Sequence, residues 1–242
     1  MKIALIGTGK MGSAIAELAI KNGHEITFKI NENSLNLLHP EHLSKADIAI
    51  EFTSPEAAPI NLRWCLKAGV PVVCGTTGWH DQYNAVATEF IEGKGSLLYA
   101  SNFSIGVNFL FELNRLLAGW MSKIPTYKPF ISEIHHIHKM DSPSGTAISL
   151  ANDIINFDPH YKNWGLVDNN IPENETLVPI EALRAEEVVG RHAVSWRSPI
   201  DKITLHHEAY SREGYAAGVL QAAEWIQGKK GVFTMKDLLF PS

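Results

Sequence analysis

The sequence has few cysteines, no long apolar run at its start and no excess of positive charge. Two of its 242 residues are cysteines, Cys65 and Cys74, and we expect both to be small core residues in a reduced compartment. The first apolar run, Ile3 to Ile6, is too short for a signal peptide or a membrane span, which favours a cytoplasmic protein without membrane contact. The net charge of −5 gives no support to nucleic-acid binding, which normally shows as a basic surface.

What is present is the composition of a folded protein. Apolar residues make up 45% of the chain and charged residues 19%, and the length suffices for one large domain or two small ones. In the first hundred residues apolar runs alternate with helical patterns. We expect a helix over 13–21, other helices further on, and strands at 3–6, 25–30, 48–53, 70–75 and 96–101. This alternation predicts right-handed crossovers and a parallel sheet covered on both faces.

After about residue 105 the pattern changes to a mixed α+β type. We expect an apolar helix over 107–121, a helix over 214–227, and strands at 129–136, 193–197 and 202–209. Residues 158–175 are rich in Asn, Asp, Pro and Trp without periodicity, which predicts a long loop or lid. The tail over 229–240 resembles a short capping helix, which we expect to return to the first domain. The fold class predicted is therefore α/β.

The first chemical motif is Gly7-Thr8-Gly9-Lys10-Met11-Gly12, a GxGxxG between the first predicted strand and helix. In a dinucleotide fold Gly7 would permit the tight turn, Gly9 the approach of a pyrophosphate, and Gly12 the packing of helix on strand. The helix start would then present free N–H groups to the anion. The motif alone is weak, and a glycine-rich turn is the alternative, but its position in an alternating β/α half favours nucleotide binding.

The position that often carries a ribose-binding carboxylate holds Asn31. A neutral amide would remove the repulsion of an extra phosphate, so we expect both NADH and NADPH to be accepted, unless Asn31 is only a turn residue. Two more loops end predicted strands at the carboxyl edge and could meet a nicotinamide ring, although each alone could be an ordinary turn. They are Gly75-Thr76-Thr77-Gly78 and Ala100-Ser101-Asn102-Phe103-Ser104.

The stretch EIHHIHKMDSPSGTA, at 133–147, leaves three interpretations open: a metal site, an acid/base site or a polar loop. The metal interpretation is the least favoured, because the stretch lacks the cysteines or HExxH spacing that would make it specific. A zinc site would draw on His136 and His138, which share a strand face, together with Glu133, Asp141 or the more distant His206-His207 pair.

The acid/base interpretation follows from spacing and local structure. In an extended segment His135 and His136 point to opposite faces, so one can meet a substrate while the other packs or orients. Ser144-Gly145-Thr146 precedes a helical pattern, and a helix start is suited to binding a carboxylate. With Lys139 upstream as a fixed positive charge, the stretch indicates a site for a carboxylated substrate that gains or loses a proton.

These motifs together resemble the dihydrodipicolinate reductase family, whose members act in diaminopimelate and lysine biosynthesis. The resemblance covers nearly the whole chain, and its motifs occur in the family's order. They are GTGKMG, EFTSPEA at 51–57, GTTGW at 75–79, SNFSIGVN at 101–108, the histidine stretch, LRAEEVVGRHAV and EAYSREGYAAGVLQAAEWI.

The resemblance implies a Rossmann-like dinucleotide-binding domain at 1–104, completed by 213–242, and a mixed substrate and oligomerisation domain at 105–212. It also implies a homotetramer. Reduced nicotinamide nucleotide would be bound by Gly7 to Gly12, Gly75 to Thr77 and Ala100 to Phe103. The family's site residues also match this chain: His135 as proton donor, Lys139 as catalytic cation, His136, Gly145 and Thr146 for the substrate's carboxylates, and Arg212 weakly for substrate.

The implied reaction is hydride transfer from NADH or NADPH to a cyclic imine with two carboxylates, formed when 4-hydroxy-tetrahydrodipicolinate loses water. His135, helped by Lys139, would protonate the adjacent carbon, and no metal is needed. Two alternatives stay open. One is a nicotinamide-dependent reductase of another dicarboxylate, and the other is an NAD(P)H-binding sensor without catalysis.

Overall fold

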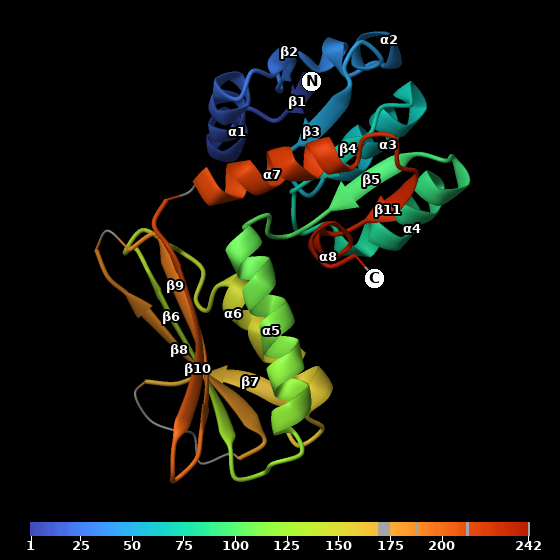
Figure 1. The fold of residues 1–242 in the computed structure, drawn as a ribbon. Helices are drawn as coiled ribbons and strands as arrows, with labels where there is room; N and C mark the ends of the chain where they lie inside the picture. The colour runs from blue at the N-terminus through green and yellow to red at the C-terminus, as the bar shows by residue number, and fades with distance from the viewer. Residues whose placement is uncertain (169–174, 187, 212, 242) are drawn as a thin grey trace. The chain divides into compact units, whose positions relative to one another are not determined.

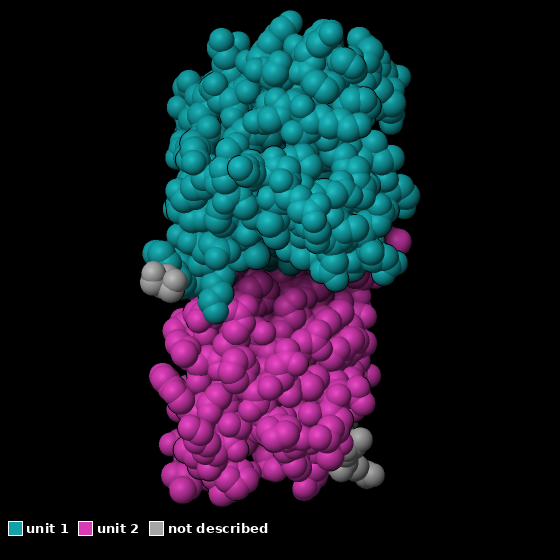
Figure 2. Space-filling view, turned by 90° about the vertical axis from the view of Figure 1, so that its right-hand side faces the viewer, with its two compact units in different colours: residues 1–105, 213–242 teal, residues 106–212 magenta. Residues whose placement is uncertain are grey.

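The computed structural model describes residues 1–168, 175–186, 188–211 and 213–241. The chain divides into two compact units, residues 1–105 with 213–242 and residues 106–212, which Figure 2 colours separately. The predicted boundaries lay after residues 104 and 212. Each unit contains its own sheet and its own apolar core.

Among the described residues, the first unit has a sheet of six strands in the order β11-β5-β4-β3-β1-β2 (Figure 1). The strands are β1 (Lys2–Ile6), β2 (Glu25–Ile30), β3 (Ile48–Glu51), β4 (Val72–Cys74), β5 (Ser96–Tyr99) and β11 (Gly231–Phe233). Every neighbouring pair is parallel. All carboxyl ends therefore meet at one edge, which is where ligands bind in open α/β sheets.

Helices pack on both faces of this sheet, because its strands are apolar on both sides. Ile3 and Leu5 of β1 pack into a core with α1, α7 and α8, whereas Ala4 and Ile6 pack into a second core with α2, α3 and α4. The helices are α1 (Lys10–Lys21), η1 (Leu35–Leu37), α2 (Pro40–Leu43), α3 (Ala58–Ala68), α4 (His80–Glu92), α7 (Glu213–Trp225) and α8 (Met235–Leu239).

The C-terminal tail adds a strand that the sequence analysis missed. β11 pairs with β5 from Gly231 opposite Ser96 to Phe233 opposite Leu98. The Ser96 hydroxyl also donates a hydrogen bond to the Lys229 carbonyl at 2.5 Å. A strand of three residues is too short to leave a periodic pattern, so only the following helix could be predicted.

The second unit has a mixed sheet of five described strands in the order β10-β9-β6-β8-β7. β9 is antiparallel to both β10 and β6, while β6, β8 and β7 are parallel. The elements are α5 (Ile105–Met121), β6 (Lys128–His135), α6 (Gly145–Phe157), β7 (Asn163–Leu166), β8 (Leu177–Arg184), β9 (Gly190–Arg197) and β10 (Lys202–Ala209).

Helices α5 and α6 cover one face of this second sheet. Leu110 and Leu117 of α5 and Leu150 of α6 pack against Ile131 of β6 and Trp196 of β9, which is fully buried. Across the described residues, no helix combines the length and apolar character needed to cross a membrane.

The predicted α/β class, with a parallel first sheet and a mixed second region, is confirmed. The predicted long loop over 158–175 is wrong in its middle, where β7 pairs with β8. Asn163 and Leu166 are exposed and Trp164 packs against the core of the second unit, so the strand lacks an alternating apolar pattern that periodicity could reveal. Residues 169–174 of that prediction lie outside the described residues.

Candidate active site

The glycine motif forms the turn between β1 and α1. Gly7 has a φ of +100°, and a Cβ there would lie 1.9 Å from the Phe52 carbonyl oxygen. A Cβ on Gly12 would lie 2.1 Å from the Gly7 carbonyl oxygen. The predicted tight turn at Gly7 and close packing at Gly12 are therefore confirmed. A Cβ on Gly9 would have no atom within 4 Å among the described residues, and no side chain caps α1 there, so the helix start is open to a ligand.

Two cavities open at the carboxyl edge of the first sheet. The larger, of about 640 Å³, is lined by the glycine turn, the ends of β2 and β3 and the helix α3, including Gly7, Thr8, Gly9, Asn31, Glu32 and Asn61. The smaller, of about 360 Å³, is lined by the start of α1 and the loop after β4, including Lys10, Met11, Gly12, Gly75, Thr76 and Thr77. Gly9, Phe52 and Thr53 line both cavities, so the two are adjacent.

Residues 100–103 do not line either of these two cavities. Phe103 is 2% exposed and packs near Phe52, with ring centroids 6.0 Å apart. A Cβ on Gly218 of α7 would lie 1.8 Å from the Phe103 carbonyl oxygen. Asn102 Oδ1 accepts the Ser104 N–H at 2.9 Å. In this structure Phe103 is a core residue and Asn102 shapes the turn.

The Asn31 side chain takes part in a turn after β2. Its Oδ1 accepts hydrogen bonds from the Asn33 N–H at 2.9 Å and the Ser34 hydroxyl at 3.2 Å. The Asn31 side-chain oxygen is therefore used within the turn, as the turn-residue alternative expects. The next residue, Glu32, brings a carboxylate to the lining of the larger cavity, a role that the sequence analysis did not assign.

A fully buried carboxylate, Glu51, supports the loop between the two cavities. It accepts hydrogen bonds from the Thr53 hydroxyl, from Asn61 Nδ2 at 3.2 Å and from the Cys74 thiol at 3.1 Å. Burial, followed by the charge of Glu51, raises the pKa of the Cys74 thiol well above its usual value. The Thr53 N–H donates to the Thr76 hydroxyl at 2.7 Å. No local sequence motif predicts this network, because its members lie on three separate segments of the chain.

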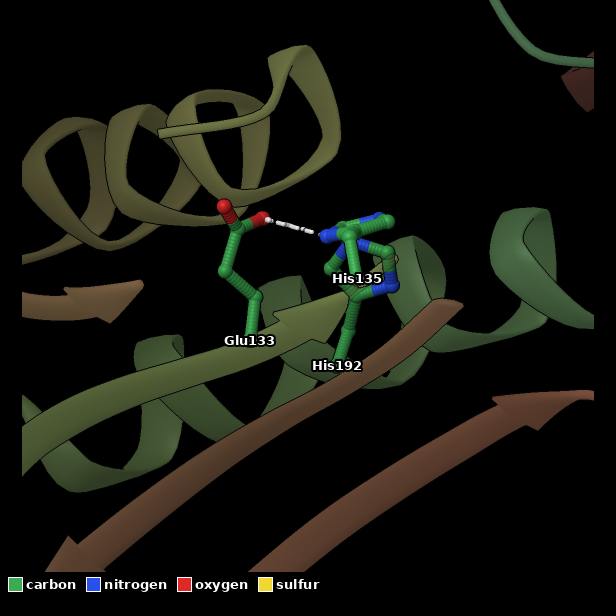
Figure 3. Close-up of side chains that lie close together, drawn as sticks. All are labelled: Glu133, His135 and His192. Carbon is green, nitrogen blue, oxygen red and sulfur yellow. Dashed lines mark ion pairs between the residues drawn. The ribbon is translucent and has the colours of Figure 1, made fainter. Parts of the chain in front are cut away.

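The histidine stretch begins at the end of β6 (Figure 3). Glu133 and His135 are two residues apart and share one face of the strand, where they are 0% and 7% exposed. His136 follows the last residue of the strand and is half-buried, and the ring of the exposed His138 lies 6.2 Å from its ring. The two neighbours thus differ in burial, with His135 in the buried cluster and His136 more accessible.

Glu133 is the centre of a buried polar cluster. Its Oε1 accepts the Ser144 N–H at 2.9 Å, and its Oε2 accepts the Ser144 hydroxyl. Glu133 Oε2 lies 3.5 Å from His192 Nε2 and 3.7 Å from His135 Nδ1 (Figure 3). Arg184 Nη1 lies 3.7 Å from Glu133 Oε1, and the His135 and His192 rings meet edge to face with centroids 4.9 Å apart. The cluster thus joins β6, β8, β9 and the start of α6.

Burial and charge act in opposite directions on the acid and the base of this cluster. Burial raises the pKa of Glu133, but hydrogen bonds from His192 and Ser144 outweigh it and bring the pKa to about 2. Burial lowers the pKa of His135 to about 4, and the Glu133 charge opposes this shift only in part. At neutral pH the chain alone therefore holds an ionised Glu133 beside a neutral His135.

Ser144 caps α6 from inside the protein. Its hydroxyl accepts the Ala147 N–H at 3.2 Å, and the residue is 3% exposed. Since its N–H and hydroxyl both face Glu133, its side chain is not available as the substrate contact that the sequence suggested. Next to it, a Cβ on Gly145 would have no described atom within 4 Å, so the backbone at the helix start is accessible there.

Lys139 lies in the loop after β6 and is paired with a carboxylate. Its ammonium is 2.8 Å from both oxygens of Asp141. The Asp141 carbonyl accepts a hydrogen bond from Arg184 Nη2 at 2.5 Å, which fastens the loop to the end of β8. The Asp141 carboxylate therefore holds the positive charge of Lys139 beside the histidine motif. A carboxylated substrate would supply the same kind of group.

The described residues contain one group with the spacing of a metal site, Glu133, His135 and His192, whose ligand atoms lie within 4.8 Å of one another. This is not the set that the sequence analysis considered, which was built on His136 and His138. Glu133 already accepts two hydrogen bonds from Ser144 and faces the cation of Arg184. A second cation there would compete with these partners, which argues against a metal ion at this cluster.

His192 and Arg184 have no predicted role from the sequence, and Glu133 is predicted there only as a possible metal ligand. His192 lies in VVGRHAV, a stretch noted only for its family resemblance, and no local spacing relates it to His135, which it meets only through the pairing of β6 with β9. Arg212, which the resemblance connected weakly with substrate, lies outside the described residues.

Comparisons with known proteins agree across both units. The family model described as dihydrodipicolinate reductase, N-terminus, matches residues 1–103, and its C-terminal counterpart matches residues 106–239. A 4-hydroxy-tetrahydrodipicolinate reductase from Christiangramia forsetii is 46% identical over 240 residues, covering 99% of this chain and 98% of the relative. One from Methanopyrus kandleri is 34% identical over 264 residues, covering 98% and 96%.

Solved structures agree at the level of the fold. A dipicolinate-bound dihydrodipicolinate reductase from Paenisporosarcina sp. TG-14 has a TM-score of 0.79 at 23% identity and covers 97% of each chain. An amine dehydrogenase from Mycobacterium smegmatis has a TM-score of 0.61 at 12% identity, covering 96% of this chain and 94% of that one.

Proposed function

We infer the function of this chain from the dihydrodipicolinate reductase family, to which it belongs over both of its units. It is a nicotinamide-dependent oxidoreductase that reduces 4-hydroxy-tetrahydrodipicolinate to tetrahydrodipicolinate in diaminopimelate and lysine biosynthesis. The observation that carries this conclusion is the 46% identity over 99% of the chain to a reductase of this name. The roles of individual residues are our proposals and rest on the geometry described above.

We assign the nicotinamide nucleotide to the two adjacent cavities of the first unit. Gly9 leaves the uncapped start of α1 open, as an incoming pyrophosphate requires. The groups that would hold it are Gly7, Thr8, Gly9, Lys10, Met11, Gly12, Asn31, Gly75, Thr76 and Thr77. Ala100, Ser101, Asn102 and Phe103 would shape the neighbouring loop. When bound, this nucleotide supplies the hydride.

Both NADH and NADPH are expected to be accepted, with a moderate preference for NADH. Asn31 brings no charge to the ribose position, but Glu32 lines the same cavity with a carboxylate that would repel an extra phosphate. Calorimetric titration with the two nucleotides tests this proposal. A preference of about a hundredfold or more, or one for NADPH, would contradict it, because an exposed carboxylate has a modest effect.

The substrate's carboxylates are assigned to the start of α6 and the motif before it. Gly145 and Thr146 begin the helix and would provide its first N–H groups, while His136 and Lys139 would add donors and positive charge. A bound carboxylate would replace Asp141 as the partner of Lys139. Ser144 contributes indirectly, by capping the helix and bonding to Glu133.

His135 is assigned as the proton donor. Hydride addition to the imine leaves an electron-rich enamine, and His135 gives a proton to its carbon. The pKa of about 4 means that His135 is mostly neutral in the chain alone. Two substrate carboxylates would raise this pKa by favouring the charged imidazolium, so the acid is formed when the substrate binds.

A coupled assay tests the function. The product of the preceding synthase is supplied with NADH or NADPH, and nicotinamide absorbance is followed. Oxidation that depends on this substrate is the expected result. Nucleotide binding without oxidation would indicate the sensor alternative, and oxidation only with another dicarboxylate would indicate the second alternative. The homotetramer and the cytoplasmic location stay predictions from the sequence.

A further inference from the structure

We propose that Glu133 and His192 are positioning residues of this reduction: together they orient His135, and through Ser144 they connect it to the start of α6. This proposal rests on the function proposed above. It concerns two side chains that do not reach the reacting atoms but determine how the proton donor is presented.

Glu133 is an unusual residue for its surroundings. It is fully buried, and burying a carboxylate costs several kcal/mol unless it is well paired. Here the pairing is extensive, with the N–H and hydroxyl of Ser144 bound to its two oxygens and Arg184 3.7 Å away. An apolar side chain could occupy this position without that cost. The carboxylate is therefore best explained by the groups that it faces, His135 and His192.

The orientation of His135 follows from the surroundings of its two ring nitrogens, Nδ1 and Nε2. Nδ1 makes no hydrogen bond to the described residues and lies 3.7 Å from Glu133 Oε2, so a proton on Nδ1 would be directed at a carboxylate. Nε2 is then the nitrogen left for the substrate. A Cβ on Gly190 would lie 3.2 Å from Nε2, so glycine keeps that side of the ring uncrowded. A carboxylate that fixes the tautomer of a catalytic histidine works in the same way in Ser-His-Asp sites.

His192 restrains the same ring from β9. It is 3% exposed, and its ring meets that of His135 edge to face. Its Nε2 lies 3.5 Å from Glu133 Oε2 and 3.2 Å from the Ser144 hydroxyl. One carboxylate oxygen is thus shared by two imidazoles and the cap of α6. A substrate carboxylate at Gly145 would sit one residue from that cap, which connects substrate binding to the placement of the acid.

The charges around His135 give the two positioning residues different signatures. The groups acting on it are Glu133 from its own strand, His192 from β9, Arg184 from the end of β8 and Lys139 from the following loop. Of these described groups, Glu133 alone is negative. Removing its charge should make His135 lose its proton at lower pH, whereas removing the His192 imidazole should have the opposite effect.

The test compares Glu133→Gln and His192→Gln with wild type in the full chain. The matched controls are Glu208→Gln, which removes an ion pair to Arg191 in the same unit, and His206→Gln, which changes an exposed histidine of β10. Values of kcat and of KM for substrate and NADH are measured across pH. We expect Glu133→Gln to lower kcat about 30-fold and His192→Gln about 5-fold, below the loss expected for the acid itself. NADH KM should stay unchanged in both.

The pH profile separates positioning from a purely structural role. Activity needs protonated His135, so kcat falls as pH rises, and this fall should move to lower pH in Glu133→Gln and to higher pH in His192→Gln. Glu133→Asp, which restores the charge, should bring the profile back toward wild type. Folding of each variant is checked by near-ultraviolet circular dichroism. If Glu133→Gln does not fold, His192→Gln and Ser144→Ala still decide the matter, because both keep the carboxylate.

Profiles and kcat values of these variants equal to those of the Glu208→Gln and His206→Gln controls would overturn the proposal. So would shifts in the same direction for Glu133→Gln and His192→Gln. Failure of the proposed function is distinguishable: wild type would then not oxidise nicotinamide with the substrate, or His135→Gln would be fully active. An active wild type, an inactive His135→Gln and an ordinary Glu133→Gln would reject the positioning role alone.

Discussion

The two units prepare for their ligands in different ways. In the first unit the candidate site is made of backbone and space: the turn at Gly7, the open position at Gly9 and the uncapped start of α1. In the second unit it is made of ionisable side chains packed together, with Glu133 and His135 buried beside each other. Backbone groups do not titrate, so the first site should tolerate changes of pH, whereas the second should respond to them.

Replacing His135 with Gln should have the largest effect. Because the proton donor is lost while the first unit is untouched, we expect kcat to fall about 100-fold or more. The affinity for NADH, measured by calorimetry, should stay as in wild type. His138→Gln is the matched control, since the exposed His138 has no assigned chemistry. Near-normal turnover in His135→Gln, or an equal loss in the control, would contradict the assignment.

Two glycine variants examine the first unit by separating binding from folding. Gly9→Ala places its Cβ in open space, so the thermal midpoint should be unchanged while NADH binds about tenfold more weakly, a change of about 1.4 kcal/mol. Gly7→Ala places its Cβ 1.9 Å from the Phe52 carbonyl oxygen at a φ of +100°, which should destabilise the fold by about 3 kcal/mol. Tight NADH binding to Gly9→Ala would show that the pyrophosphate does not pass there.

Stability should depend on pH through the second unit. His135 has a folded pKa of about 4, below its usual 6.5, so the stability due to its neutral form is complete above pH 6.5 and is lost as pH falls toward 4. Glu133, at about 2 instead of 4.5, adds a further loss between pH 4.5 and 2. When the pH is lowered from 7 to 5, the thermal midpoint of His135→Gln should therefore fall by about 2 to 4 °C less than that of wild type. Equal losses in wild type and variant would contradict the low pKa of His135.

Glu32→Gln should have the smallest effect. Among the described residues that line the larger cavity of the first unit, Glu32 is the one with a charged side chain. Removing the carboxylate should improve NADPH binding relative to NADH by about threefold, the size expected for a solvent-screened charge. Calorimetric titration with both nucleotides measures it, and Glu41→Gln on α2 is the control. An unchanged ratio would mean that Glu32 does not face the ribose phosphate.

The same difference between the units decides how far sequence could predict them. The residues of the glycine turn are contiguous in the sequence, and the spacing of the glycines indicates the backbone conformation, so the turn could be predicted. The parallel sheet could be predicted from the alternation of strand and helix patterns. Asn31 and Phe103 were harder, because an Asx turn and a core position depend on neighbours that the motif does not contain.

In the second unit the sequence indicated His135, Lys139 and the helix start, but not the partners that set their properties. His192 meets Glu133 because β9 pairs antiparallel with β6, where the two residues are directly opposite. Ser144 was predicted at the start of α6, yet a helix start does not reveal that its side chain turns inward. Contacts of this kind come from strand order and register, which hydrophobic periodicity alone does not determine.

The last strand of the first sheet also bears on how the protein is made. The hydrogen bond between Ser96 and Lys229 joins positions 133 residues apart, and β11 covers the edge of β5 only after the whole second unit has left the ribosome. During synthesis the nascent first unit therefore presents an open strand edge, the kind of surface that pairs with other chains. Synthesis of residues 231–233 is the event that closes it.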